Sequence, residues 1–313
     1  MAMTIETYLA LGLEKLAPTQ ANGRSIADFA VSLNHAGDRC YNPCAEALAG
    51  SDVPAGEVTA YRDWARSAVF ADTTRDIWVY TPPGFDGATA NLIVFNDGAG
   101  YLNREGPVRA ARVLDALLAK GEIAPTVAVF VNPGRLPIAD DASDREKREA
   151  ASAQRSLEYD SVTPEFGRFL LDEVLPFVEA SHDLKFTTEP AGRTICGISS
   201  GGICAFTAAW FFPERFGRVL SHCGSFTNIH GGHNYPYLIR STPRKPVKVF
   251  LQSGANDASY ITGDWPLANQ TMASALAFAG YDHRFEFGTG GHSLRHGGAI
   301  LADSLRWLWR TET

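Results

Sequence analysis

Short runs of apolar, mostly β-branched residues alternate along this chain with longer segments that have helical periodicity. The runs LIVF (92–95) and TVAVFV (126–131) are typical of strands buried on both faces of a sheet. Between them, residues 108–120 repeat apolar side chains at helical spacing and are followed by Gly121. Parallel strands need such helix-length crossovers, so the sequence predicts an α/β fold in three layers, with a mostly parallel sheet of about eight strands.

The same patterns predict the other elements. Strands are expected at 58–68, 75–80, 193–197, 218–222, 247–252 and 284–288. Helices are expected at 164–180, with Thr163 as the N-cap, and at 202–212, 266–278 and 299–309. In sheets of this kind ligands bind at the carboxyl ends of the strands, so chemistry is expected at that edge.

The composition excludes several classes of protein. The 313 residues are 45% hydrophobic and 20% charged, which suits a chain with a large core. The net charge is −7 without a basic stripe, which argues against nucleic acid as a partner. No apolar run approaches the roughly 18 residues of a membrane span. The amino terminus has no signal-peptide pattern. We expect a cytoplasmic protein, unless a presequence has been removed, and the sequence leaves a homo-oligomer open.

The five cysteines do not form a disulfide framework. Cys196, Cys204 and Cys223 lie among apolar neighbours and are expected to be free, buried thiols. Cys40 and Cys44 are the only close pair, for which a local disulfide or half of a metal site stays open. No second Cys/His pair has the usual zinc spacing, so we predict no metal.

Residues 1–56 differ in character from the rest. They combine a short helical stretch with a region punctuated by glycine, asparagine and proline, and they hold few bulky apolar groups. Residues 57–313 carry the alternating pattern. We expect residues 1–56 to form an extension that packs on a main domain at 57–313.

The motif with the clearest chemistry is GISSG, residues 197–201, between a predicted strand and a predicted helix. G-x-S-x-G at that junction holds a nucleophilic serine on a sharp turn, with small residues two positions before and after it. Only Ser199 fits this frame, because a shift to Ser200 would put Ile198 where glycine is required. The helix amino terminus that follows directs N–H groups and a positive dipole end at the site.

An acid and a histidine should follow in that order along the chain. Asp257 lies just past the predicted strand 247–252, whereas Asp264 resembles a helix N-cap. His292 lies just past the predicted strand 284–288, in the segment TGGHS. His296 is interpreted as a capping residue, and His283 precedes the strand and so lies at the wrong edge. Ser199, Asp257 and His292 are therefore the predicted catalytic residues.

In the predicted reaction, His292 removes the proton of Ser199 as it attacks an acyl carbonyl, and Asp257 orients the imidazole. The oxyanion needs two N–H donors. One is expected from Ser200, the residue after the nucleophile. The other is expected from Ala99, in the glycine-rich segment NDGAG at 96–100.

Two further segments are candidates for binding substrate. The charged run that leads to Arg155 and Glu158 is expected to be a solvated helix, whose last turns bring these two side chains toward the site. The aromatic, glycine-rich stretch 226–237 offers His230 and Tyr235, and Trp265 follows the acid. His230 and His233 have no third ligand in view, so a metal is not expected there.

Taken in order, the segments GISSGG, VYTPPGFD, NDG, QSGAND and TGGHS resemble the "putative esterase" branch of the α/β-hydrolases, which includes enterochelin-esterase-like, feruloyl-esterase-like and esterase D type proteins. The similarity covers roughly residues 57–310. The resemblance implies an α/β-hydrolase sheet and cleavage of carboxylic esters without a metal or cofactor. It also implies that the residue after the Asp-Gly pair, Ala99, donates to the oxyanion, and it relates Arg155 and Glu158 to an R-x-x-E segment of the family.

The sequence thus predicts a serine carboxylic-ester hydrolase that works through an acyl-enzyme on a small or medium ester. An aromatic or sugar-linked ester suits the aromatic loops, and the resemblance implies one of feruloyl or siderophore type. Two alternatives stay open: an acyltransferase of the same fold, and a non-catalytic binding protein on a hydrolase scaffold. Transfer and hydrolysis differ in how well the site excludes water, which sequence does not specify.

Overall fold

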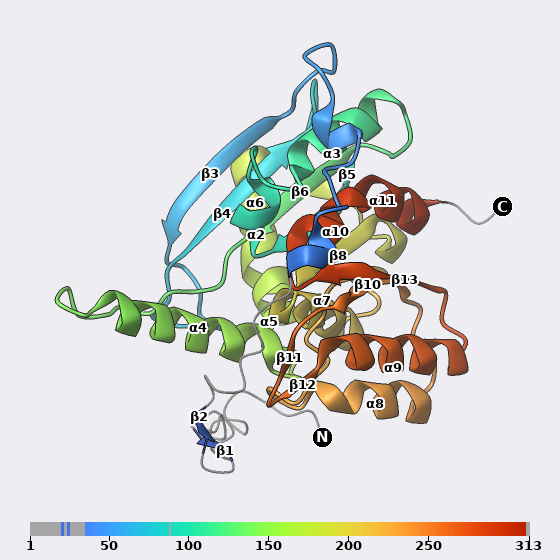
Figure 1. Ribbon diagram of the computed structural model, residues 1–313. Coiled ribbons are helices and arrows are strands. Elements are labelled where there is room, and N and C mark those ends of the chain that lie inside the picture. The colour runs from blue at the N-terminus through green and yellow to red at the C-terminus, as the bar shows by residue number, and fades with distance from the viewer. Residues whose placement is uncertain (1–19, 22–23, 26–34, 88, 311–313) are drawn as a thin grey trace.

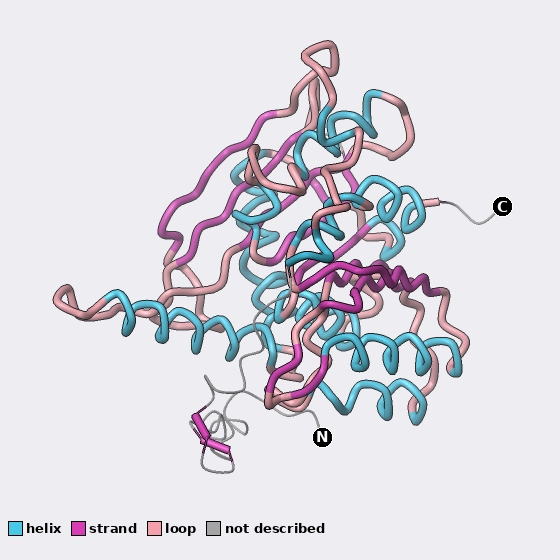
Figure 2. The backbone as a smooth tube through the Cα atoms, viewed as in Figure 1, coloured by secondary structure: helices cyan, strands magenta, loops and turns pink. Residues whose placement is uncertain are grey.

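A central sheet of nine strands organises the molecule in the computed structural model, which describes residues 20–21, 24–25, 35–87 and 89–310. The strand order is β13-β10-β9-β8-β5-β6-β4-β3, and β7 pairs with β5. The strands from β13 to β6 run parallel, whereas β4 and β3 are antiparallel to their neighbours. Helices cover both faces, as Figures 1 and 2 show. The predicted three-layer α/β architecture is confirmed.

The strands of the main sheet are β3 (Glu57–Trp64), β4 (Arg75–Thr81), β5 (Thr89–Asn96), β6 (Thr126–Val131), β7 (Lys185–Phe186), β8 (Arg193–Ile198), β9 (Arg218–His222), β10 (Lys248–Asn256) and β13 (His283–Gly291). Two short pairs lie outside it, β1 (Gln20–Ala21) with β2 (Arg24–Ser25), and β11 (Ser259–Tyr260) with β12 (Gly263–Asp264).

The α-helices are α2 (Gly98–Leu102), α3 (Ala110–Ala119), α4 (Asp144–Asp160), α5 (Glu165–Arg168), α6 (Leu175–His182), α7 (Ser200–Phe211), α8 (Tyr235–Ser241), α9 (Trp265–Phe278), α10 (Leu294–Ala299) and α11 (Leu301–Trp309). Shorter turns of helix are η3 (His35–Asp38), η4 (Glu46–Leu48), the π-helix η5 (Phe169–Val174), η6 (Pro190–Gly192) and η7 (Gly232–Asn234).

The central strands are buried on both faces, which explains their unbroken apolar character. In β5, Leu92 and Val94 belong to the hydrophobic cluster that also contains side chains of α5 to α9. The alternate residues Ile93 and Phe95 belong to the cluster under α3 and α11 on the other face. The alternation of side chains along each strand therefore builds two cores, one on each side of the sheet.

Several predicted boundaries differ in the structure. The strand predicted at 58–68 ends at Trp64, and the helix predicted at 164–180 is divided into α5, η5 and α6. Pro176, in the first turn of α6, has no N–H to continue the α-helical ladder, and the wider π turn of η5 precedes it. The N-cap of α5 is Pro164 rather than Thr163.

Helix α4 projects from the body of the protein (Figure 1), and its first turns are exposed. Ser143 and Glu146 form a capping box at its start. The expected solvated helix is therefore present. Within the described ranges, no helix has the length and apolar character needed to cross a membrane.

The five cysteines are free thiols in the structure, with Cys196, Cys204 and Cys223 buried as expected. Cys40 and Cys44 do not form a disulfide. The helical stretch expected near the amino terminus, and the segment tested for a signal-peptide pattern, lie outside the described residues, apart from Gln20.

A carboxylate in η4 links this helical turn to the end of α3 and to α11. Glu46 Oε1 accepts hydrogen bonds from Arg306 Nη2 of α11 at 2.6 Å and from Lys120 Nζ, just after α3, at 3.0 Å. Burial alone would raise the pKa of Glu46, but these hydrogen bonds outweigh it and lower the pKa to about 2. The ionised carboxylate is thus favoured by folding.

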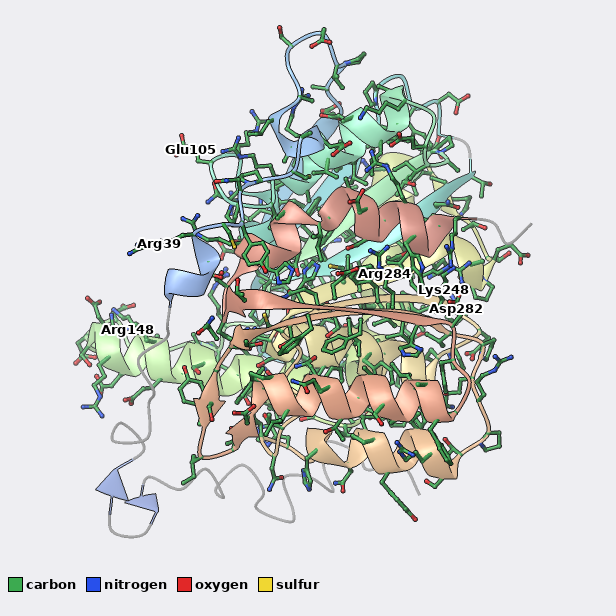
Figure 3. The ribbon with its side chains drawn as sticks, turned by 45° about the vertical axis from the view of Figure 1, so that its right-hand side comes forward. Arg39, Glu105, Arg148, Lys248, Asp282 and Arg284 are labelled. Atoms are coloured by element: carbon green, nitrogen blue, oxygen red, sulfur yellow. The ribbon has the colours of Figure 1, made fainter. Side chains whose placement is uncertain are left out.

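Glu46→Gln is expected to lower the melting temperature at neutral pH, because an amide cannot pair with both cations. Since the folded pKa lies below the ordinary 4.5, this stabilisation is present above that value and is lost as pH falls toward 2. The two melting temperatures should converge in acid. Thermal unfolding of both proteins from neutral pH down toward pH 2 tests this convergence. Glu105→Gln, which replaces an exposed glutamate (Figure 3), is the control. A difference between wild type and Glu46→Gln that stays constant into acid would contradict the account.

Candidate active site

Ser199 occupies a strained turn between β8 and α7. Its φ and ψ are 59° and −123°, a conformation that residues other than glycine rarely adopt. A Cβ on Gly197 would overlap the backbone of Gly201, because the strand and the helix almost touch there. The G-x-S-x-G spacing is therefore required by the backbone itself, and the serine hydroxyl lies at the carboxyl edge of the sheet.

Asp257 follows the end of β10 and has a fully buried side chain. One carboxylate oxygen, Oδ2, accepts from Ser253 Oγ at 2.8 Å. The other, Oδ1, accepts from the Ala258 N–H at 2.7 Å and lies 2.6 Å from His292 Nδ1. These contacts orient the carboxylate toward the histidine.

His292 follows β13 and joins the other two residues. Its Nε2 lies 2.8 Å from Ser199 Oγ, and its side chain is 18% exposed. Because a carboxylate can only accept, the ring carries its proton on Nδ1 and leaves Nε2 to accept from Ser199. The ring of Trp265 packs edge-to-face on the imidazole, at 5.7 Å between centroids. The structure thus brings Ser199, Asp257 and His292 into one hydrogen-bonded chain.

The rival residues have other contacts. Asp264 is the N-cap of α9 and accepts from the Leu267 N–H at 2.9 Å. His296 is buried, stacks on Tyr41 at 4.0 Å, and lies 3.0 Å from Gln252 Nε2. It packs within the protein rather than capping a helix.

The segment predicted as an oxyanion loop is the short helix α2, preceded by Asp97 at φ 55°. The Ala99 N–H donates to Asn132 Oδ1 at 3.1 Å, a contact that the sequence analysis missed. Asn132 follows β6, next to β5 in the sheet, so its position at the same edge was the available signal. Ser200 is the first residue of α7, where helix geometry supplies no intrahelical acceptor for its N–H.

Arg155 connects the two segments that flank the nucleophile. Its Nε and Nη2 each donate to the Asp97 carboxylate at 2.8 Å, and Nη2 lies 3.4 Å from the Ile198 carbonyl oxygen. The bidentate ion pair joins α4 to Asp97, just before α2, and the longer contact joins α4 to the end of β8. In this structure the guanidinium holds together segments beside Ser199, whereas the sequence analysis predicted that it binds substrate.

Glu158 and Tyr235 are corrections to the predicted substrate contacts. The Glu158 carboxylate is fully buried and binds Arg75 at 2.7 and 3.1 Å and the Gly134 N–H. Tyr235 is also fully buried and donates to Thr207 Oγ1 at 2.7 Å. Both side chains are enclosed in the core and make their hydrogen bonds there, so neither is placed to contact a bound molecule.

Trp265 lies beside the imidazole of His292, whereas His230 contacts helix α4. His230 is half-buried, with Nε2 3.1 Å from Ser156 Oγ, and burial lowers its pKa to about 4, so it is neutral at physiological pH. Trp265 is almost fully buried and contacts the imidazole rather than open space. Trp265 therefore belongs to the support of His292, a role that the sequence analysis did not foresee.

Ser225 is a residue that the sequence analysis missed. Its Oγ accepts from Trp265 Nε1 at 3.2 Å and lies 3.3 Å from Ser199 Oγ. Because Ser199 gives its only proton to His292, the hydroxyl of Ser225 is left to donate to Ser199 Oγ. Its N–H donates to the Ser199 carbonyl at 3.1 Å, which fixes its position beside the nucleophile.

Among the described residues, Cys223, Asp257 and His292 have ligand atoms within 4.8 Å of one another. Burial, with Asp257 nearby, raises the pKa of the Cys223 thiol well above its ordinary value. The carboxylate and imidazole of this cluster already bind each other at 2.6 Å. The cluster therefore overlaps the hydrogen-bonded chain that ends at Ser199.

Comparison with known proteins relates most of this chain to one protein family. The family described as "Putative esterase" matches residues 67–308. The iron(III) enterobactin esterase of Dickeya dadantii is 30% identical over 262 residues, which cover 79% of this chain and 54% of that protein. The iron(III) salmochelin esterase of Escherichia coli O6:H1 is 23% identical, over 77% of this chain and 56% of that protein. This chain spans about half the length of the curated relatives it matches.

Solved structures agree on the fold. The enterobactin esterase of Shigella flexneri superposes with a TM-score of 0.62 at 21% identity, over 83% of this chain and 60% of that one. A ferulic acid esterase of Anaeromyces mucronatus gives a TM-score of 0.64 at 15% identity, over 86% of this chain and 96% of that one. The fold is thus of the α/β-hydrolase type, as the sequence predicted.

Proposed function

Because this chain belongs to the "Putative esterase" family, we propose that it hydrolyses carboxylic esters through an acyl-enzyme formed on Ser199. The observation that carries the proposal is the continuous hydrogen-bonded chain from Ser199 through His292 to Asp257, with links of 2.8 and 2.6 Å. A nucleophile, a base and an orienting carboxylate in this order are what acyl transfer requires.

In the acylation step, Ser199 Oγ attacks the ester carbonyl carbon and its proton passes to His292 Nε2. The carbon–oxygen bond to the alcohol then breaks, and His292 returns the proton to the leaving alcohol. Asp257 holds the Nδ1 proton of the ring and stabilises the imidazolium that forms. In the second step His292 takes a proton from water, the water oxygen attacks the acyl carbon, and Ser199 leaves with its proton restored.

The oxyanion of each tetrahedral intermediate is proposed to accept from the N–H of Ser200 and the N–H of Ala99. The first lies at the amino terminus of α7, whose dipole favours negative charge. The second is held in the free protein by Asn132 Oδ1. An oxyanion competes well for this donor, because charge-assisted hydrogen bonds are stronger than neutral ones. Each donor contributes about 3 kcal/mol to such intermediates.

For the substrate we propose an ester of an aromatic acyl compound. The support comes from similar proteins. The relatives are named as enterobactin and salmochelin esterases, and the structural neighbours were solved with 2,3-dihydroxy-N-benzoyl-serine or ferulic acid. The methyl esters of these two acids, with p-nitrophenyl acetate as a generic ester, form the test panel.

Hydrolysis of each ester in the panel is measured as the release of free acid. We expect turnover of the aromatic esters above the rate of p-nitrophenyl acetate, and abolition of turnover by a fluorophosphonate. Adding an alcohol distinguishes transfer from hydrolysis, since a transferase would form the new ester in place of the acid. No turnover of any ester by folded protein would contradict the proposal.

Ser225→Ala is expected to lower kcat about tenfold with little change in KM, because the lost hydrogen bond acts on Ser199 rather than on substrate. Trp265→Phe keeps the ring on His292 but removes the donor to Ser225, so a similar loss is expected. The double variant should lose less than the product of the two single effects, because both act through one hydroxyl. Steady-state kinetics of all three measure this coupling, and multiplicative losses would contradict it.

A further inference from the structure

A short amino-terminal segment, residues 37–41, packs on the edge of the sheet next to His292. The strand there, β13, is the outer strand of the sheet, so its outward N–H groups need partners from elsewhere. The Thr289 N–H donates to Tyr41 Oη at 3.0 Å, and Thr289 Oγ1 donates to the Gly37 carbonyl at 3.2 Å. A Cβ on Gly37 would overlap the Thr289 carbonyl, so the two backbones are as close as glycine allows.

Asp38 makes the contacts nearest to the histidine. Its side chain is buried, whereas the next residue, Arg39, is exposed and points away from the sheet (Figure 3). Asp38 Oδ1 accepts from the Gly291 N–H at 2.8 Å, and Oδ2 accepts from Ser293 Oγ at 2.9 Å. These donors are the residues immediately before and after His292. One carboxylate thus holds the backbone on one side of His292 and the side chain on the other.

The His292 loop, residues 291–293 at the junction of β13 and α10, needs support from other parts of the chain. Gly288, Gly290 and Gly291 precede His292, and glycines give a backbone more freedom to lose on ordering than other residues do. The imidazole must nevertheless keep both short contacts, to Ser199 and to Asp257. Hydrogen bonds to a carboxylate are the stronger, charge-assisted kind. Tyr41 adds a second fixed point by stacking on His296, four residues after His292.

We propose that Asp38 is a positioning residue for catalysis, which fixes the His292 loop so that the imidazole reaches Ser199 and Asp257 together. The inference rests on the proposed function, and it makes residues 37–41 part of the catalytic apparatus although they lie about 250 positions away in sequence. A misplacement of a reacting group by about 1 Å can cost about 100-fold in rate.

The variants are Asp38→Ala, Asp38→Asn and Tyr41→Phe, with Asp52→Asn, an exposed aspartate of the same amino-terminal part, as matched control. Asp38→Ala should lower kcat about 100-fold while KM changes by less than about threefold. Asp38→Asn should lower kcat about tenfold, because an amide can accept from only one of the two donors. Tyr41→Phe, which keeps the stacking on His296, should have a smaller effect in the same direction, and Asp52→Asn should have none.

A spectroscopic readout separates positioning from loss of stability. The Nδ1 proton of His292, in a 2.6 Å hydrogen bond to Asp257, should give a far-downfield proton NMR signal. In Asp38→Ala this signal should broaden or vanish well below the melting temperature, while Asp52→Asn keeps it. If Asp38→Ala does not fold, Asp38→Asn and Tyr41→Phe carry the same comparison.

Folded Asp38 variants with wild-type kcat and an unchanged signal would overturn the inference, and wild-type reaction with a fluorophosphonate would still support the proposed function. Conversely, an unreactive wild type would count against the proposed function, while the NMR comparison would still decide whether Asp38 holds the His292 loop.

Discussion

Replacing Ser199 by alanine is expected to lower kcat by about a million-fold, leaving only the rate that binding and the oxyanion donors provide. The physical reason is that, among the described residues, Ser199 is the one whose hydroxyl is hydrogen-bonded to His292 Nε2, at 2.8 Å. Hydrolysis of the aromatic esters measures the loss. The fold should survive, because alanine can occupy the turn at about the strain that serine already bears.

Ser200→Ala is the matched control for this experiment. It keeps the backbone N–H, the group proposed to contact the oxyanion, and should lose no more than about tenfold in kcat. A large loss in Ser200→Ala with a small loss in Ser199→Ala would mean that the nucleophile had been assigned in the wrong frame.

Asp257→Asn is expected to lower kcat about ten-thousand-fold. The amide cannot stabilise the imidazolium, and it allows the ring to carry its proton on Nε2, where Ser199 needs an acceptor. The side chain is fully buried and keeps partners in Ser253 and Ala258, so the substitution changes charge more than shape.

Asp264→Asn distinguishes this prediction from a general effect of removing a carboxylate nearby. Asp264 caps α9, and asparagine caps a helix about as well as aspartate does. Its kcat should stay within about twofold of wild type. Steady-state kinetics of the two variants side by side give the answer, and a heavy loss in Asp264→Asn alone would transfer the acid role to that residue.

The residues with the clearest signals in the sequence were those governed by local rules. The glycines around Ser199 are required because a strand and a helix nearly collide there, and that constraint is visible in five consecutive residues. Asp257 and His292 could be predicted to lie near Ser199 because parallel strands bring their carboxyl ends to one edge of the sheet. The periodicity of apolar residues likewise predicted the order of strands and helices for most of the chain.

The errors came where tertiary packing decides. In the sequence, Glu158 and Tyr235 look available to a substrate. In the structure they are bound by Arg75, 83 positions away, and by Thr207, 28 positions away. Conversely, nothing local to Asp38 or Ser225 indicates that the first approaches the histidine loop and the second the nucleophile. Such pairings depend on which elements the fold brings together, so periodicity and spacing do not contain them.

The central claim is that Ser199 is an activated nucleophile, and intact-mass analysis after treatment with a fluorophosphonate tests it most directly. The account predicts a single adduct on the wild-type protein and none on Ser199→Ala. An adduct of equal yield on the variant, or no adduct on correctly folded wild type, would contradict it.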